Sequence, residues 1–245
     1  MKAIELYDLV LDTPNEIFSP NTLKARIALN IKGLSYETKW LDFFQVHSVI
    51  PTITKTGEKP TVPVIVDHQH DDKAVQDSWE IVKYLDKTYP DTPPLIHGNN
   101  EALQFFFYNY ANANILVPIF KLCVLTVVEK CPTKEMQNWF RQTREQSFNM
   151  TLEEFAGDDE NVHVENIKSG LGLVHTTLKS YSYLSGEKPG FSDVTLAALY
   201  KMFSVFRSDL FEQTLLDAYP DDVLRQWWRR MEKYTKHSPP AEAVH

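Results

Sequence analysis

The sequence lacks the features that mark several classes of protein. Its 25 Lys and Arg are outnumbered by 33 Asp and Glu, which gives a formal net charge of -8, and no basic stripe is present. This argues against a nucleic-acid-binding surface, because such affinity rests on clustered Lys and Arg. Nowhere do about 18 apolar residues run together, and the first residues carry charge too early for a signal peptide. We therefore expect a soluble, cytoplasmic protein.

Cysteine is also scarce. Cys123 and Cys131 are the only two, and both fall in or beside a long predicted helix rather than in a CxxC or metal-binding spacing. We expect buried, reduced thiols rather than a disulfide or a reactive site, and no metal site. The sequence has no internal repeat either, which argues against a repeat architecture.

The first part of the chain, residues 1–90, predicts a domain that mixes strands and helices. An alternating run at 2–9, apolar residues at helical spacing up to a glycine, and an aromatic-rich run at 35–43 predict a βαβ unit with parallel strands. Residues 44–60 look irregular and polar. Two short strands and a helix at 78–89 complete the pattern, so the order is β-α-β followed by β-β-α.

The second part of the chain predicts helices throughout. The stretch "YPDTPPLIHGNN" has the composition of a linker, and residues 101–245 then show helical periodicity, with a kink expected at Pro118. The fold class is thus an α/β domain followed by an all-α domain.

Ser19 and Pro20 stand together at the start of the first predicted helix. A serine at the N-cap with proline at the first helical position is a common way to begin a helix, because the hydroxyl accepts an unpaired N–H and proline loses nothing there. The alternative is functional: the positive end of the helix dipole faces an anion such as a thiolate, to which Ser19 would donate a hydrogen bond.

Two other pairs of residues lie where the chain would come near that helix start. Val62 and Pro63 begin a short strand, and because proline cannot donate to a sheet, a special turn is expected there, with a cis peptide as one form of it. Asp77 and Ser78 stand at the N-terminus of the next helix. These are the pieces of a thioredoxin-like fold.

Together with the all-helical second part, these motifs resemble the cytosolic glutathione transferases over almost the full length of the chain. The resemblance implies that Val62, ahead of a cis Pro63, pairs its backbone with the cysteinyl part of glutathione, and that Asp77 and Ser78 hold the γ-glutamyl end. It also implies that "PGFSDVTLAAL" caps a helix of the second domain through Asp193, with glycine in place of the usual hydroxyl residue.

The segment "FSPNTLKAR" is similar to the serine- and cysteine-type members, and "DSWEIVKYLDKTYPDTPPLI" looks most like the fungal FuA class, which is related to glutathione-dependent etherases. The resemblance implies that Ser19 activates the thiol of glutathione, which is then conjugated to small hydrophobic aromatic electrophiles or cleaves an aryl ether. Tyr7, near the end of the first strand, is the rival catalytic residue. The alternative function is a ligandin that binds polyphenols or glutathione conjugates without turnover.

Further contacts are expected from the helix start, the loop and the second domain. Asn21 is a candidate glutathione ligand, and Lys59 is our choice for the glycyl carboxylate, against the alternative of a solvated loop charge. Lys24, Gln45 and His47 are weaker candidates. In "FFFYNY", Phe106 and Tyr110 are expected to line the hydrophobic substrate site, although such aromatics also pack between helices. The family resemblance further implies a homodimer.

Overall fold

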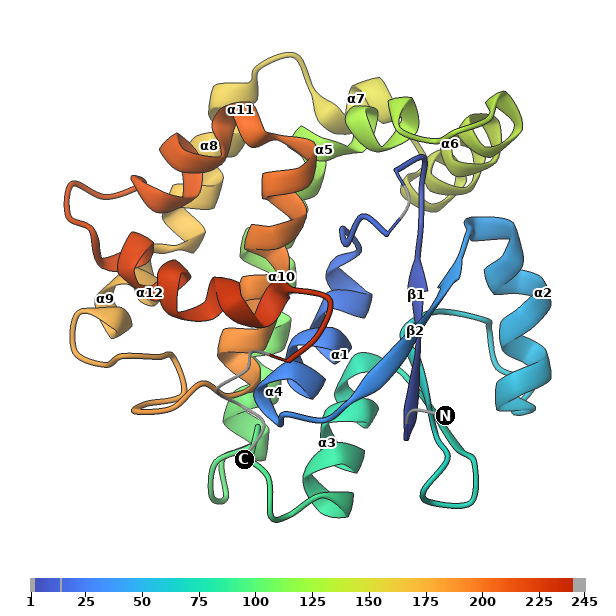
Figure 1. Ribbon diagram of the computed structural model, residues 1–245. Helices are drawn as coiled ribbons and strands as arrows, with labels where there is room; N and C mark the ends of the chain where they lie inside the picture. Colours follow the sequence, from blue (N-terminus) through green and yellow to red (C-terminus); the bar gives the residue numbers. More distant parts are fainter. Residues whose placement is uncertain (1–2, 14, 240–245) are drawn as a thin grey trace.

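The computed structural model describes residues 3–13 and 15–239, and its N-terminal part combines a small sheet with three helices (Figure 1). The elements are, in chain order, β1 Ile4–Leu9, α1 Pro20–Ile31, β2 Tyr36–Leu41, α2 Phe43–Thr54, β3 Val64–Asp67, β4 Lys73–Gln76 and α3 Ser78–Thr88.

The four strands form one sheet in the order β2-β1-β3-β4. β1 and β2 run parallel, with Ile4 opposite Tyr36, whereas β3 is antiparallel to both β1 and β4. Along β1 the buried residues alternate with partly exposed ones, as a strand between two different environments requires. This is the thioredoxin-like arrangement, so the predicted fold class of the N-terminal part is confirmed.

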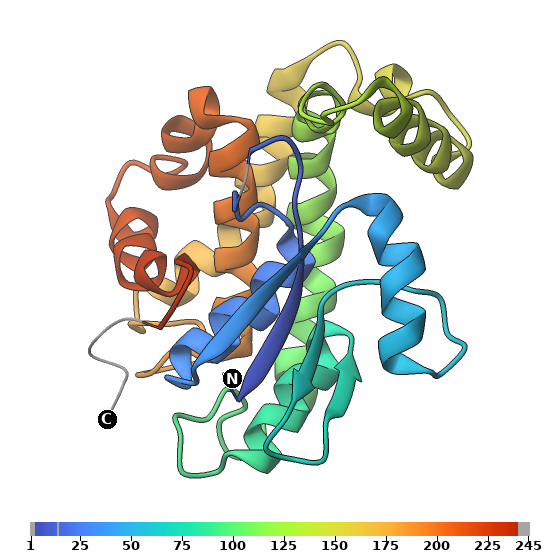
Figure 2. The same cartoon turned by 45° about the vertical axis from the view of Figure 1, so that its right-hand side comes forward.

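Helices cover the two faces of the sheet unequally. α1 and α3 lie between the sheet and the C-terminal helices, and α2 lies on the other side (Figures 1 and 2). α1 is buried along most of its length because it packs against both α3 and α10. One hydrophobic core therefore continues from β1 through α1 into the helical part. α2 packs for most of its length on a small separate cluster formed by Leu41, Val46, Ile50 and Val64, and its first residue, Phe43, joins the main core.

The prediction that residues 44–60 are irregular is wrong for most of that stretch, which is the helix α2. Asp42 and Gln45 form a capping box, in which the Asp42 carboxylate accepts the Gln45 N–H at 2.7 Å and the Gln45 side chain accepts the Asp42 N–H at 2.9 Å. The helix continues past Pro51 to Thr54. The many polar residues of this stretch make it look irregular, but Phe43, Val46 and Ile50 are spaced along one buried face of the helix.

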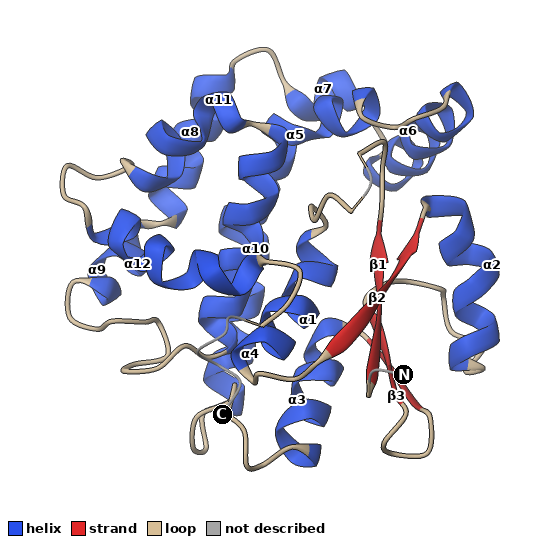
Figure 3. Cartoon of the chain, viewed as in Figure 1, coloured by secondary structure: helices blue, strands red, loops and turns tan. Residues whose placement is uncertain are grey.

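The C-terminal part is helical, as predicted (Figure 3). Its elements are α4 Glu101–Ala111, the π-helical turn η1 Asn112–Leu116, α5 Val117–Glu129, α6 Lys134–Phe148, α7 Leu152–Ala156, α8 Glu160–Gly170, α9 Gly172–Leu178, α10 Phe191–Phe206, α11 Ser208–Phe211, the π-helical turn η2 Glu212–Leu216, α12 Val223–Met231 and the 3-10 helix η3 Glu232–Thr235.

The stretch Glu101–Glu129 is one continuous helical rod made of α4, η1 and α5. By length and composition alone it could cross a membrane, but here it packs against α8 and α10 in the helical part. The interruption expected at Pro118 takes the form of the π-helical turn just before it. Gly170 of α8 packs directly against this turn, where any larger residue would collide with the Asn114 carbonyl.

Asp193 fixes the N-terminus of α10, the central helix of the second part. Its buried carboxylate accepts the N–H groups of Gly190 and Leu184 and the indole N–H of Trp227, at 3.1, 2.8 and 2.9 Å. The helix-capping role implied for Asp193 is therefore observed, and Trp227 belongs to the core. Both cysteines are buried and free, as expected.

Candidate functional site

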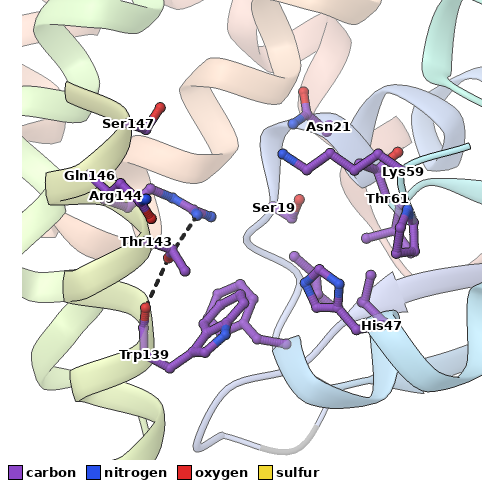
Figure 4. A pocket seen from close by; sticks show the side chains of 15 residues that line it. Ser19, Asn21, His47, Lys59, Thr61, Trp139, Thr143, Arg144, Gln146 and Ser147 are labelled. Carbon is purple, nitrogen blue, oxygen red and sulfur yellow. Dashed lines mark hydrogen bonds between the residues drawn. The ribbon is translucent and has the colours of Figure 1, made fainter. Parts of the chain in front are cut away.

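A cavity of about 620 Å³ lies between the N-terminal domain and α6 (Figure 4). Its walls come from three regions that are far apart in the sequence: the start of α1, the α2 helix with the loop that follows it, and the middle of α6. The lining residues are Leu9, Ser19, Asn21, Phe43, Val46, His47, Lys59, Pro60, Thr61, Val62, Trp139, Thr143, Arg144, Gln146 and Ser147. The structure thus brings four predicted site residues, Ser19, Asn21, Lys59 and Val62, into one cavity.

Ser19 is the N-cap of α1 and is 4% exposed. Its hydroxyl oxygen accepts the Thr22 N–H over a long 3.5 Å, and Pro20 occupies the first turn, as predicted. No group in residues 3–13 or 15–239 accepts the Ser19 hydroxyl proton. The hydroxyl therefore caps its helix weakly and still has a proton to donate into the cavity.

The peptide between Val62 and Pro63 is cis, as the sequence suggested. The Asp77 N–H donates to the Pro63 carbonyl at 3.2 Å, so the start of α3 is tied to this turn. Asp77 has a positive φ of 79° and caps α3 by accepting the Trp79 N–H at 2.8 Å. Ser78, the first residue of α3, is 2% exposed. Asp77 and Ser78 thus stand beside the turn rather than in the wall of the cavity.

A buried lysine lies near the start of α1, between that helix and α4. Lys24 donates to the Asn21 side-chain oxygen at 3.0 Å, and its ammonium lies 4.7 Å from the centre of the Tyr108 ring. Burial lowers the pKa of Lys24 to about 8, against an opposing attraction from the Asp77 carboxylate. The two helix N-termini and this ammonium make the region favourable for carboxylates.

Tyr7 does not reach the cavity. It lies in β1, and its hydroxyl donates to the Glu5 carboxylate at 2.8 Å. Burial and the neighbouring Glu5 both raise the pKa of Tyr7, which is the opposite of what an activating hydroxyl needs. The geometry favours Ser19 over Tyr7.

The structure does not bring Phe106 and Tyr110 to this cavity. Both line a separate, smaller cavity of about 240 Å³ with residues of α9 and α10. Phe106 is 66% exposed, and the Tyr110 hydroxyl donates to the Gly170 carbonyl at 2.8 Å, so it holds α4 to α8.

Other aromatics line the cavity beside Ser19. Phe43 of α2 and Trp139 of α6 stack with ring centres 5.4 Å apart, and His47 meets the same Trp139 edge-on. The sequence does not predict this wall, because residues 44–60 look irregular and α6 carries no motif. The "DFFQ" capping box was the signal that could have revealed α2.

The sheet, the cis-proline turn and the appended helices define a thioredoxin-like protein with a second, all-helical domain. Residues 17–93 match the glutathione S-transferase N-terminal domain, and residues 102–234 match the glutathione S-transferase C-terminal domain. The chain therefore belongs to the glutathione transferase family, as its motifs indicated.

Relatives resemble the chain along most of its length. Glutathione S-transferase 1 of Dianthus caryophyllus is 29% identical over 216 residues, which are 85% of this chain and 84% of that protein. Among solved structures, glutathione transferase GSTFuA2 from Phanerochaete chrysosporium is 30% identical with a TM-score of 0.85, covering 96% of this chain and 99% of that one. CsGST63524 of Ceriporiopsis subvermispora, solved in complex with glutathione, is 28% identical with a TM-score of 0.82, covering 98% and 99%.

Proposed function

We propose that this protein is a glutathione transferase in which Ser19 activates the thiol and the cavity beside it receives a small aromatic electrophile. The observation that carries the proposal is the Ser19 hydroxyl, which lies at the N-terminus of α1 in the cavity wall. Within the described residues it accepts a hydrogen bond but donates none. Conjugation, with aryl-ether cleavage as a related reaction, is the activity. We further propose a cytoplasmic homodimer with domains at 1–90 and 101–245.

Glutathione is a substrate with two carboxylates and one ammonium, and the chain offers a partner for each. Lys59 is proposed to hold the glycyl carboxylate, with Asn21 nearby, and the Val62 backbone to pair with the cysteinyl unit. Asp77 and Ser78 are proposed to hold the γ-glutamyl end. This assignment is supported by the way the Asp77 N–H ties the start of α3 to the Val62–Pro63 turn.

One hydroxyl at a helix N-terminus can supply the free energy needed to stabilise the glutathione thiolate. Lowering a thiol pKa from about 8.5 by about 2 units corresponds to about 2.7 kcal/mol of preferential thiolate stabilisation. A hydrogen bond to a charged acceptor contributes about 1.5 to 3 kcal/mol, and the helix N-terminus about 0.3 to 1 kcal/mol more. The thiolate sulfur then attacks the electrophile.

We expect Ser19→Ala to lower kcat about tenfold or more while the dissociation constant for glutathione stays nearly unchanged, because the hydroxyl acts on the sulfur and not on the peptide arms. Asp77→Asn is the matched control: it keeps the helix cap and the backbone preference but should raise the dissociation constant about tenfold to a hundredfold, by loss of a charged hydrogen bond.

Steady-state kinetics with a chloronitrobenzene and calorimetry with glutathione separate these effects. Full turnover in Ser19→Ala, together with inactivity of Tyr7→Phe, would move the catalytic role to Tyr7. Ser19→Cys provides a positive test. A thiol at a helix N-terminus should exchange with mixed disulfides of glutathione, so this variant should gain thioltransferase activity.

A further inference from the structure

Arg144 on α6 is a cation in the wall of the cavity. Its guanidinium extends from α6 toward the side of the cavity where Ser19 lies (Figure 4). The side chain is partly buried, and its recorded partners are the Thr143 hydroxyl, which accepts from Arg144 Nη1 at 3.2 Å, and the ring of Phe140, whose centre is 4.8 Å away. No carboxylate within the ranges 3–13 and 15–239 pairs with it.

Several other partly or fully buried arginines of this chain are paired with acids. Arg26 contacts Asp8 at 2.7 Å in the core, and Arg207 contacts Glu160 at 2.6 Å. Arg141, one turn before Arg144 on the same helix, contacts Glu153 at 2.8 Å. A guanidinium that is removed from water is usually neutralised by a neighbouring carboxylate in this way. Within the described residues Arg230 also lacks such a partner and donates to the Ser182 carbonyl at 2.8 Å, but it does not line the cavity, whereas Arg144 does.

The side chain of Arg144 is held in place rather than free to turn into solvent. The Thr143 hydroxyl that accepts from it also donates to the Trp139 carbonyl at 2.9 Å, so the contact is anchored to the helix backbone. Burial lowers the pKa of the guanidinium from its usual value, which reflects lost hydration, although an arginine remains charged at neutral pH. An anion entering the cavity would restore the missing interactions.

In the proposed function neither carboxylate of glutathione needs Arg144, because Lys59 on the opposite wall holds the glycyl carboxylate and the γ-glutamyl end lies at Asp77 and Ser78. In Figure 4, Lys59 and Asn21 lie on the side of Ser19, whereas Arg144 comes from the facing helix. Beside Arg144, the stacked rings of Trp139 and Phe43 form an apolar platform in the same cavity. A flat ring on that platform with an acidic group at its edge would use both features.

We propose that Arg144 determines specificity for the second substrate by selecting aromatic electrophiles that carry a carboxylate. This inference rests on the proposed function, because it assigns the other substrate of the same site. The planar guanidinium binds the carboxylate while the ring lies against Trp139, and this leaves the carbon that bears the leaving group free for the thiolate. Arg144 binds the substrate and does not take part in bond making.

A chloronitrobenzoate and its uncharged carboxamide are the matched probes. In both, the glutathione sulfur forms a bond to the ring carbon, the carbon–chlorine bond breaks, chloride leaves with the electron pair, and the thiol proton goes to solvent. We expect the wild-type protein to have a higher kcat/KM for the benzoate. Arg144→Gln should lower kcat/KM for the benzoate about tenfold to a hundredfold, mainly by raising KM. It should change kcat/KM for the carboxamide by less than about twofold.

Two further variants serve as controls for Arg144→Gln. Arg144→Lys should recover part of the preference, because it keeps the charge without the planar fork. Arg141→Gln changes a residue on the same helix but outside this cavity, so kcat/KM for both substrates should stay unchanged. Turnover of the carboxamide by Arg144→Gln shows that this variant is folded. An equal loss for both substrates, or a raised KM for glutathione with each of them, would overturn the proposal.

Binding of nitrobenzoate and nitrobenzamide, which lack the leaving group, separates this inference from the proposed function. It is followed by tryptophan fluorescence and needs no turnover. A preference for the anion that disappears in Arg144→Gln supports the proposal even if no conjugate ever forms. Normal conjugation without any preference for the anion would overturn it while the proposed function stands.

Discussion

Lys24 and Lys32 show that the surroundings of a buried lysine decide what its charge does to stability. Both lie in α1 or at its end, and each is 2% exposed. The Lys32 ammonium contacts the Asp86 carboxylate at 2.8 Å, whereas Lys24 has an amide oxygen and an aromatic ring as its direct partners. Because burial lowers the pKa of Lys24 to about 8, its charged form costs stability.

This gives a prediction about pH. The pKa of an unfolded lysine is about 10.4, so between about pH 8 and 10 the unfolded chain holds a proton at Lys24 that the folded chain has lost, and the Lys24 contribution to stability rises with pH. Below pH 8 both states are protonated and the full cost is present. Lys24→Met should therefore stabilise the fold at pH 7 by about 1 to 3 kcal/mol, and by less at pH 10.

Urea denaturation at pH 7 and pH 10 measures the difference. Lys32→Met is the matched control with the opposite sign, since it removes the cation paired with the Asp86 carboxylate, which keeps only its backbone N–H partners at Leu95 and Ile96, and should destabilise the protein. If Lys24→Met were less stable than wild type at pH 7, the contacts of Lys24 with Asn21 and Tyr108 would outweigh its lost hydration.

Among the elements, α2 has only a limited share in the main core. Beyond Phe43, which joins the continuous core, α2 packs on the small cluster around Ile50 and Val64, and it supplies Phe43 and His47 to the cavity. Elements with few buried contacts open at lower free energy than the molecule as a whole. The capping box formed by Asp42 therefore contributes much of what keeps this wall in place.

Asp42→Ala should lower the stability of α2 by about 1 kcal/mol, which is the usual effect of removing a side-chain N-cap. We expect faster amide hydrogen exchange over Phe43–Thr54, with little change in the global denaturation midpoint. Thr133→Ala removes the corresponding cap of α6 and serves as the control, because it should leave exchange in α2 unchanged. Unaltered exchange in α2 upon Asp42→Ala would show that packing alone holds the helix.

Among the cavities formed by the described residues, two are lined by several aromatic side chains and differ in size. The one beside Ser19 is about 620 Å³ and contains the Phe43–Trp139 stack, whereas the one at Phe106 is about 240 Å³. Ligand sites usually occupy about 300 to 1,000 Å³. A flat polyphenol should therefore bind in the larger cavity and compete with the electrophile.

We expect competitive inhibition toward the electrophile, weakened by Trp139→Ala and unaffected by Phe106→Ala. Noncompetitive inhibition that disappears in Phe106→Ala would instead assign the ligand to the smaller cavity. Mass spectrometry of polyphenols incubated with glutathione decides between enzyme and ligandin: an adduct or a cleaved ether supports catalysis. Recovery of every compound unchanged, with unreactive model electrophiles, would favour a binding protein.

The sequence alone determined the features that are encoded locally. The Ser19–Pro20 helix start, the alternation in β1, the turn at Pro63 and the capping role of Asp193 each depend on a few neighbouring residues, so short motifs revealed them. The same motifs indicated the family and the thioredoxin-like and helical parts.

Only the tertiary structure decided which distant residues meet. Trp139 and Arg144 lie about 120 residues after Ser19 in the chain, and no local pattern distinguishes the face of α6 that turns toward Ser19 from its exposed face. The aromatic neighbours of Phe106 predict a cleft residue, but the packing of α4 against α10 places it at the smaller cavity and not beside Ser19. Local propensity sets where a helix begins, and the packing of whole elements sets what its side chains face.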